Sequence, residues 1–251
     1  MSKVVVIGGG VAGMIAAIRA SLKNEVILLE GNDKCGKKIL LTGNGRCNYW
    51  NENISIDSYH TDNLKKLEEI ISSSNQKEVL TFLEKMGLFP RIKNGYYYPF
   101  SNQASSVRNL LTRELEKRNV EVVYQKVKHI SKQEHYFLID TSKQTFVSDY
   151  VILATGSTAS PKTGSDGSGY LLAKSLGHTI SEVTPALVPM KAKESCLKDW
   201  EGVRTDSKVS LIVENKKVAE ELGEIQLTNY GISGICVFNL SGLASKNLKL
   251  G

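Results

Sequence analysis

The chain has 251 residues, 41% of them hydrophobic and 23% charged, with a formal net charge of +6. This is an ordinary globular composition. No run approaches the roughly 18 apolar residues that span a bilayer, and the first residues lead directly into an apolar strand instead of a signal peptide. Lys and Arg alternate with Asp and Glu in residues 64–71 and 113–118, as on solvated helix faces. We therefore expect a cytoplasmic protein with no membrane and no nucleic-acid partner.

The chain begins with the pattern of a strand–helix–strand unit. Residues 3–8 (KVVVIG) form a short, β-branched apolar run, which predicts a buried parallel strand. Glycines follow, then the Ala-rich residues 11–22, which favour a helix. Residues 25–30 (EVILLE) predict a second buried strand that ends in an acid. Together these segments predict a βαβ unit.

Residues 36–118 are predicted to leave this unit as a helical and hairpin excursion. Residues 36–53 are rich in Gly and Asn, so we expect a loop or a broken helix, followed by helices at about 61–73 and 76–86. Asn94-Gly95 predicts the turn of a hairpin. Ser101 is the expected cap of a helix that runs to about Arg118.

The rest of the chain predicts more strands and a second domain. Residues 120–148 suggest a meander of alternating short strands, as in residues 120–130 and 135–140, and residues 149–156 another buried strand that ends at a glycine. Beyond Pro185 new strands are expected at 208–213 and 224–228. We predict an α/β fold, with one domain at 1–187 and part of an inserted, mainly β domain at 188–251.

A glycine motif lies between the first predicted strand and helix. Gly8, Gly10 and Gly13 fit G-x-G-x-x-G, in which the first glycine permits a tight turn, the second admits a pyrophosphate and the third lets helix and strand pack closely. Glu30 ends the next strand 17 residues after Gly13, where an acid binds ribose hydroxyls. An acid there favours an unphosphorylated ribose, hence FAD or NAD.

Later segments decide between these two cofactors. Ala154-Thr155-Gly156 ends an apolar strand and resembles the element that closes over FAD in flavoproteins of the glutathione-reductase type, although an ordinary buried strand could end in this way too. Val127 lies where such proteins place their adenine-binding strand. The chain is therefore predicted to form a Rossmann-like FAD-binding domain of that type.

Several longer segments carry a more specific resemblance. They are residues 36–51, which include TGNGRCN, and residues 95–107, 154–170, 177–178, 185–190 and 228–234. In this order they resemble the aminoacetone-oxidase-like (BaiN- or YhiN-type) NAD(P)/FAD-dependent oxidoreductases. Asn229 and Ser157 depart from that pattern, since relatives often have His and Gly there. The family is usually much longer, so the chain is expected to be shortened at its C-terminal side.

The resemblance implies a cofactor site. It places Lys37 and Lys38 near the ribose and residues 44–48 close to the flavin. Arg46 could instead form a structural ion pair, and Cys47 could be a reactive thiol or, more plainly, a small packing residue. The predicted cofactor-binding residues are Gly8, Gly10, Val11, Ala12, Gly13, Glu30, Lys37, Lys38, Asn44, Gly45, Arg46, Cys47, Asn48, Val127, Ala154, Thr155 and Gly156.

These observations predict a FAD-dependent oxidoreductase. The expected reaction is hydride transfer through flavin N5 to or from a small amine, ketone or unsaturated ring. No second glycine motif follows a strand, so NAD(P)H would dock only transiently as reductant. Two alternatives stay open: a non-catalytic or truncated FAD- or nucleotide-binding module, and an NAD-dependent enzyme without flavin. The four cysteines show no metal spacing and are expected to be free thiols. The sequence selects no catalytic residue, substrate or oligomeric state.

Overall fold

The computed structural model describes residues 1–61, 63–73, 76–193 and 195–248. The chain divides into two compact units, Met1–Ile180 and Ser181–Gly251. The division between the two units lies slightly before the domain boundary that the sequence predicts at residues 187 and 188. That each unit is a separate domain stays a prediction. Within the described ranges, no helix has both the length and the apolar character that crossing a membrane requires.

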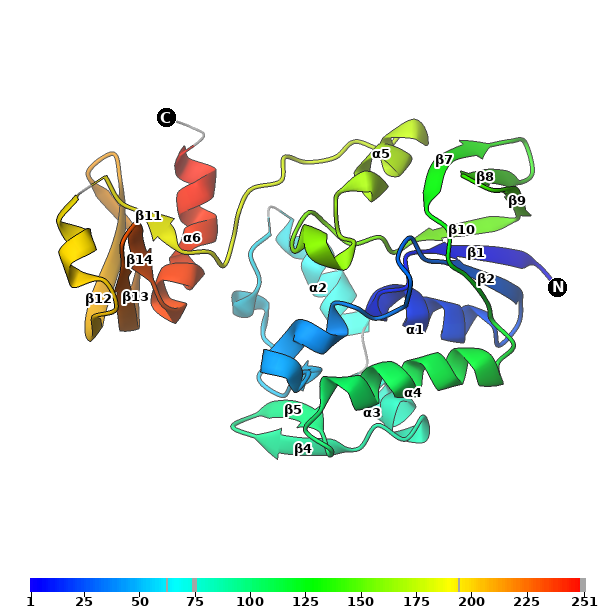
Figure 1. Ribbon diagram of the computed structural model, residues 1–251, viewed down its shortest axis with the longest axis horizontal. Coiled ribbons are helices and arrows are strands. Elements are labelled where there is room, and N and C mark those ends of the chain that lie inside the picture. The colour runs from blue at the N-terminus through cyan, green and yellow to red at the C-terminus, as the bar shows by residue number, and fades with distance from the viewer. Residues whose placement is uncertain (62, 74–75, 194, 249–251) are drawn as a thin grey trace. The chain divides into compact units, whose positions relative to one another are not determined.

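A parallel four-stranded sheet forms the centre of the larger unit (Figure 1). Its strands are β1 (Lys3–Ile7), β2 (Glu25–Leu29), β6 (Glu121–Val123) and β10 (Tyr150–Leu153), in the order β10-β1-β2-β6. Helix α1 (Val11–Ala20) connects β1 to β2 and confirms the predicted βαβ unit. The predicted α/β fold of Rossmann type is thereby confirmed.

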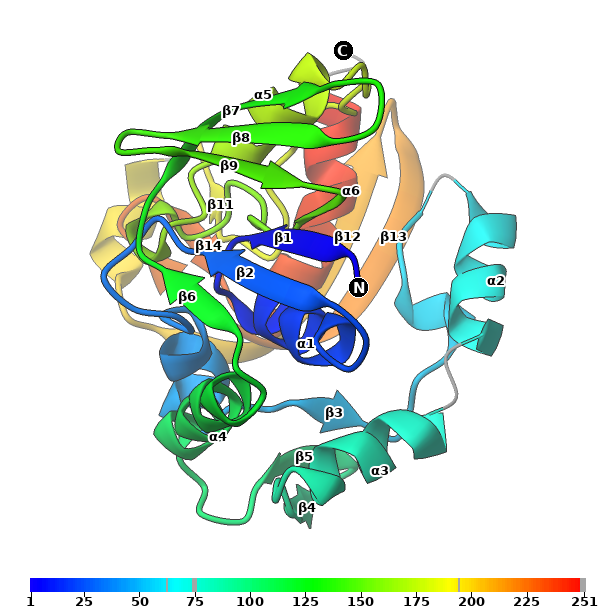
Figure 2. The same cartoon turned by 90° about the vertical axis from the view of Figure 1, so that its right-hand side faces the viewer.

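Both faces of this sheet are buried, which explains its unbroken apolar strands. Side chains of β1 and β2 alternate between two clusters. On one face they pack against α1 and α4 (Ala104–Lys117), and on the other against an antiparallel sheet (Figure 2). The helix-facing side chains are Val4, Val6, Val26 and Leu28, and the opposite set is Val5, Ile7, Ile27 and Leu29.

The antiparallel sheet consists of β7 (Val127–Lys132), β8 (Phe137–Thr141) and β9 (Thr145–Ser148). The short strands predicted over residues 120–148 do not form one meander, because the chain leaves the parallel sheet after β6 and enters the second sheet at Val127. Strand β10 is also less buried than predicted. It lies at the edge of the parallel sheet, and its Tyr150 is 60% exposed.

The excursion between β2 and β6 follows the predicted order. A kinked 3-10 helix (Ile39–Gly45) precedes β3 (Trp50–Asn51), and a short 3-10 turn (Ile56–Ser58) precedes helices α2 (Leu64–Ser73) and α3 (Gln76–Lys85). Strands β4 (Pro90–Lys93) and β5 (Tyr96–Pro99) form the predicted hairpin, with positive φ at Asn94 and Gly95. Strand β3 pairs with the other side of β5.

The start of α4 differs from the prediction. The residue before its first turn is Gln103, and the Ser101 hydroxyl accepts a hydrogen bond from the Gln103 amide at 3.3 Å. Ser101 therefore shapes the loop before the helix instead of capping the helix itself. After β10, a 3-10 turn (Pro161–Thr163) leads into α5 (Ser168–Ser175), which packs against β7.

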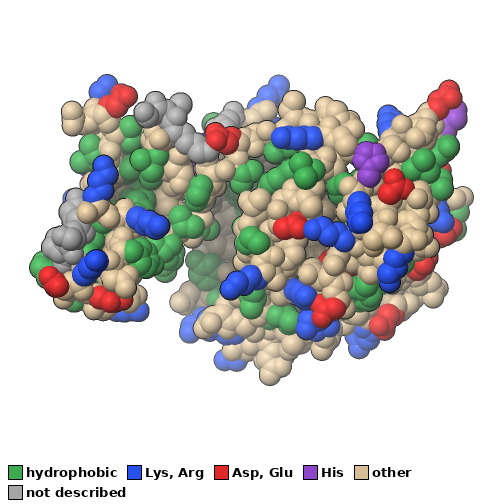
Figure 3. All heavy atoms as spheres, turned by 45° about the horizontal axis from the view of Figure 1, so that its top comes forward, with side chains coloured by type: hydrophobic (Ala, Val, Ile, Leu, Met, Phe, Trp, Pro, Cys, Tyr) green, Lys and Arg blue, Asp and Glu red, His purple; other side chains and the backbone are tan. Residues whose placement is uncertain are grey.

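The smaller unit is an antiparallel sheet with one helix. Strands β11 (Met190–Lys191), β12 (Arg204–Val213), β13 (Lys216–Thr228) and β14 (Gly231–Ser233) are ordered β11-β14-β13-β12, and a 3-10 helix (Ser195–Trp200) precedes β12. Helix α6 (Ile235–Leu248) packs on β13 through buried Cys236, Val237 and Leu240. Figure 3 shows hydrophobic side chains gathered on the visible face of this unit, at the left.

Candidate functional site

A cavity of about 720 Å³ lies at the carboxyl ends of β1, β2 and β10 in the larger unit. Its size is within the roughly 300–1,000 Å³ of typical ligand pockets, and its position is where open α/β sheets bind ligands. The lining comes from segments that are far apart in the sequence: residues 7–12, 29–32, 36–39, 47–49, 125–127, 154–156 and 161–166.

The three motif glycines satisfy three different steric requirements. Gly8 has φ +106°, and a Cβ on it would lie 2.5 Å from the Ala154 carbonyl oxygen. A Cβ on Gly13 would collide with the carbonyl oxygen of Gly8. A Cβ on Gly10, in contrast, would meet nothing within 4 Å. Gly8 and Gly13 therefore allow the turn and helix to pack, and Gly10 leaves space at the cavity.

The N-terminus of α1 borders that space. Gly10 precedes the first helical residue and no side chain caps the helix. The first N–H groups of a helix have no partner within it, and they attract anions together with the helix dipole. Val11 and Ala12 line the cavity at this end, whereas Gly13 packs behind it. These features fit a pyrophosphate.

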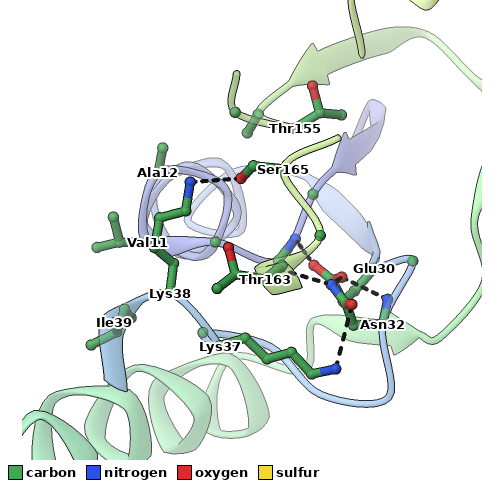
Figure 4. Close-up of a pocket in the computed structure, with 18 of the residues that line it drawn as sticks. Val11, Ala12, Glu30, Asn32, Lys37, Lys38, Ile39, Thr155, Thr163 and Ser165 are labelled. Carbon is green, nitrogen blue, oxygen red and sulfur yellow. Dashed lines mark hydrogen bonds between the residues drawn. The ribbon is translucent and has the colours of Figure 1, made fainter. Parts of the chain in front are cut away.

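Glu30 is buried and fully engaged by its neighbours (Figure 4). Its Oε2 accepts a hydrogen bond from the Gly9 amide at 2.6 Å. Its Oε1 accepts hydrogen bonds from the backbone and side-chain amides of Asn32, at 2.7 and 2.6 Å. Glu30 therefore fixes the glycine turn as well as facing the cavity, and its binding of a ribose stays a prediction.

The cavity is lined by the lysines Lys34, Lys37, Lys38, Lys126 and Lys162. The Lys38 Nζ donates to the Ala159 carbonyl and to the Ser165 hydroxyl, both at 2.7 Å. The Lys37 Nζ lies 2.6 Å from Asp33, and this hydrogen bond holds the pKa of Asp33 below its ordinary value. Lysines around a cavity favour an anionic ligand.

Two loops meet at the rim through an ion pair. The Lys126 Nζ lies 2.6 Å from the Asp166 Oδ2. The hydrogen bond from Lys126, followed by those from Ser168, lowers the pKa of Asp166 well below its ordinary range. The Asp166 Oδ1 accepts a hydrogen bond from the Ser168 amide at 3.0 Å, so Asp166 bonds to the first residue of α5.

The remaining predicted residues divide between the cavity and the surface. Val127 lines the cavity at the start of β7, and Ala154, Thr155 and Gly156 line it after β10. Cys47 and Asn48 also line it. Burial raises the pKa of the Cys47 thiol, so Cys47 is a neutral thiol.

The exposed part of the TGNGRCN loop does not line the cavity. Asn44, Gly45 and Arg46 are exposed. The Arg46 guanidinium lies over the Tyr98 ring, 5.4 Å from its centroid, and its Nε donates to the Gly43 carbonyl at 3.2 Å. The structure thus gives Arg46 a ring partner in place of the ion pair that the sequence left open.

Sequence reasoning missed several lining residues. Asn32 follows Glu30 closely, and an amide so near a ribose-binding acid was an available signal. Thr163 and Ser165 gave no local signal, because they reach the cavity from about 130 residues further along the chain, as in the Asn32–Thr163 contact at 3.4 Å. Thr42 and Tyr49 flank the predicted loop and also line the cavity.

The described residues offer no group of three or more His, Cys, Asp or Glu side chains that could hold a metal ion. Cys35, Cys47 and Cys236 are free and buried, as predicted for the thiols. The side chain of Cys196 lies outside the described part of the structure.

Comparison with known proteins agrees with this geometry. The family model described as the HI0933-like protein Rossmann domain matches residues 2–238. The chain is 42% identical over 252 aligned positions to the 3-dehydro-bile acid delta(4,6)-reductase of Clostridium scindens, covering 99% of this chain and 62% of that protein. It is 27% identical to the ribosomal RNA dihydrouridine synthase of Escherichia coli, covering 94% and 60%.

The chain thus spans about three fifths of the length of these curated relatives. Among solved structures, it is similar to a ferredoxin-flavin thioredoxin reductase from Clostridium acetobutylicum, with 19% identity and a TM-score of 0.39. That likeness covers 64% of this chain and 40% of the reductase. The fold assignment does not depend on it, since the sheet order and the glycine turn carry it.

Proposed function

The chain belongs to the HI0933-like family, and from this premise we propose that it is the FAD-binding part of an oxidoreductase that reduces an unsaturated ring. The observation that carries the proposal is the glycine turn. Gly10 leaves open space beside an uncapped helix N-terminus, and lysines surround the cavity. This donor set fits the pyrophosphate of a dinucleotide. When bound, FAD would supply hydride transfer at N5.

The residues of this chain would bind and orient the cofactor. Glu30 holds Gly9 and Asn32, which fixes the turn in one geometry. Lys38 attaches the segment around Ser165 to the opposite wall of the cavity. Cys47 and Asn48 would border the flavin ring. Asn48 offers both donors and acceptors, and Cys47 contributes an uncharged surface.

The names of the two relatives support the reaction class. One is named as a reductase of a bile acid and the other as a synthase of dihydrouridine, so both names describe the saturation of a ring double bond. We propose this class for the present chain in preference to an amine or ketone. NAD(P)H, docking transiently, is the proposed reductant, because the sequence holds one glycine motif only.

Visible absorbance tests the proposal directly. The purified chain, with FAD added if needed, should show bands near about 375 and 450 nm that bleach with NAD(P)H. A colourless protein that binds NAD but takes up no FAD would support the NAD-dependent alternative. Bound flavin that no nicotinamide and no unsaturated substrate oxidises or reduces would support a non-catalytic binding module.

A variant at Gly10 links the absorbance to the site. In Gly10→Val the new side chain meets no protein atom within 4 Å of its Cβ but occupies the proposed phosphate space. We expect a folded protein that binds FAD at least about tenfold more weakly. The control is Gly242→Ala in α6, where the added Cβ makes an ordinary 3.4 Å contact with Ala186. Equal FAD binding by both variants would contradict the site.

A further inference from the structure

The hairpin of β4 and β5 has two chemically different faces. Antiparallel partners point to the same face. The pairs Pro90–Pro99 and Ile92–Tyr97 therefore share one face, and Arg91–Tyr98 and Lys93–Tyr96 share the other. The first face packs inward at its base, where Pro99 is buried and Tyr97 packs edge-on against Tyr49 with ring centroids 6.3 Å apart, whereas Ile92 near the tip is 50% exposed.

The second face is exposed except at Tyr98, which is half-buried, and it combines aromatic rings with cations. Phe89 and Phe100 continue the pairing at its base, where the Phe100 amide donates to the Phe89 carbonyl at 2.9 Å. Phe100 is 75% exposed and Phe89 61% exposed. We call this the outer hairpin face; its residues are Phe89, Arg91, Lys93, Tyr96, Tyr98 and Phe100.

Folding adds a third cation from a distant segment. Arg46 lies over the Tyr98 ring, and Tyr98 pairs across the strands with Arg91. None of the six residues of the outer hairpin face is acidic, and the described carboxylate at its tip is Glu52, beside Gly95. On the visible face of the larger unit in Figure 3, in contrast, Lys and Arg lie among Asp and Glu.

We propose that the outer hairpin face binds a single-stranded polynucleotide. Tyr96 and Tyr98 are two residues apart in β5, so their side chains follow one another at about 6.6 Å along the strand, and Phe100 lies in the turn just after it. Sequence-tolerant binding of single strands uses such rings to stack on bases, and cations beside them to contact phosphates. Arg46, Arg91 and Lys93 are placed for that second task.

A membrane surface fits the same face less well. Interfacial binding needs an apolar element that enters the lipid, together with cations around it. The tip of this hairpin is the polar turn Asn94–Gly95 with the Glu52 carboxylate beside it. A polar tip is poorly suited to entering lipid, whereas rings beside cations suit a single-stranded polynucleotide.

The outer hairpin face is connected to the cavity by one short loop. Thr42 and Cys47 line the cavity, while Gly43 between them lies against Tyr98. A Cβ added to Gly43 would be 3.5 Å from the Tyr98 ring. A strand held on the face would thus end near Cys47 and Asn48. In this respect the inference rests on the proposed function, since it identifies a base in a polynucleotide as the ring to be reduced.

The sequence-based expectation of no nucleic-acid partner came from the even spread of cations along the chain. Arg46 is 45 residues before Arg91 in the sequence, and folding brings both to Tyr98. The sequence gives no signal of that clustering. A binding measurement therefore decides between the expectation of no nucleic-acid partner and the present proposal.

The measurement is fluorescence anisotropy of a labelled, mixed-sequence single-stranded RNA, titrated with the full chain at several salt concentrations. We expect binding that weakens with salt. Arg91→Gln/Lys93→Gln should reduce the slope of log affinity against log salt by about 1.4, or about 0.7 for each lost phosphate contact. Phe100→Ala, which changes no charge, should weaken binding by roughly 5- to 150-fold.

The matched control removes two exposed lysines from the other side of the larger unit. Lys128→Gln/Lys143→Gln, in the sheet of β7, β8 and β9, loses the same charge and should bind like the wild type. No binding by the wild type, or equal losses in both double variants, overturns the proposal. Binding to phosphatidylglycerol vesicles without binding to RNA also overturns it, in favour of a lipid surface.

The flavin spectrum of the same preparations separates this inference from the proposed function. Bound, reducible flavin with no RNA binding overturns the outer hairpin face alone. RNA binding that depends on Phe100, in a protein that takes up no flavin, supports the face and contradicts the proposed oxidoreductase.

Discussion

Two glycine-containing loops contribute residues to the lining of the same cavity, and glycine has a different purpose in each. In the turn after β1, Gly8 and Gly13 are required by space, since a Cβ on either would meet backbone atoms. In the TGNGRCN loop, φ is positive at Gly43, Asn44, Gly45 and Cys47, yet a Cβ on Gly45 would meet nothing within 4 Å. A Cβ on Gly43 would lie 2.8 Å from the Asn48 nitrogen, so packing acts at Gly43 too, whereas at Gly45 only the backbone conformation favours glycine.

The largest effect is expected at the turn. In Gly13→Ala the new Cβ collides with the Gly8 carbonyl, and neither backbone segment can move without disturbing β1 or α1. We expect the free energy of unfolding to fall by more than about 4 kcal/mol, the range of severe overpacking. Urea unfolding measures this. Gly10→Ala, which adds the same methyl group in open space, is the control, and a similar loss in both would refute the steric account.

The two buried thiols extend the comparison, because Cys35 packs beneath the turn and Cys47 belongs to the loop. Burial, followed by the nearby Glu30 charge, raises the pKa of Cys35 from 9.0 to about 11. At pH 8 its thiolate fraction should be about 100-fold lower than in the unfolded chain. Alkylation with iodoacetamide, followed by peptide mapping, should therefore modify Cys35 about 100-fold more slowly in the folded protein.

The same raised pKa has a consequence for stability. Folding favours the neutral thiol of Cys35, so this contribution is fully present below pH 9 and is lost as the pH rises from 9 towards 11. We expect a Cys35→Ala variant to lose less stability between these pH values than the wild type. Equal losses would mean that other groups dominate the alkaline transition.

The difference between local and distant contacts explains which parts of the fold and site the sequence could predict. Gly8, Gly10, Gly13 and Glu30 lie at fixed spacing along one strand–turn–helix–strand unit, so a local motif identified them. The Lys38–Ser165 bond joins residues 127 apart, and no periodicity reports it. The meander predicted over residues 120–148 was incomplete for a related reason, since an apolar run does not reveal that the chain changes sheets at Val127.

A smaller effect is expected in the loop. Gly45 has φ +80° with open space around it, so Gly45→Ala adds only the strain of a left-handed conformation. That strain is about 1–2 kcal/mol. Urea unfolding should show this loss, clearly smaller than that of Gly13→Ala. A loss as large as at Gly13 would mean that the loop, too, is packed against something that the described residues do not supply.

The smallest expected effect is the coupling between Arg46 and Tyr98, which decides whether the loop is held by more than its backbone. A double-mutant cycle with Arg46→Met and Tyr98→Leu should give about 0.5–1 kcal/mol for an exposed cation over a ring. Arg46 also donates to the Gly43 carbonyl, and the cycle removes this contribution because it is present with or without the ring.

Arg19 over Phe82, at 5.3 Å, is a matched pair anchored in helices α1 and α3. If both pairs couple equally, the ring fixes Arg46 as firmly as a helix fixes Arg19. If only the Arg19 pair couples, backbone conformation alone determines the loop, and Arg46 is free to leave Tyr98 for a phosphate.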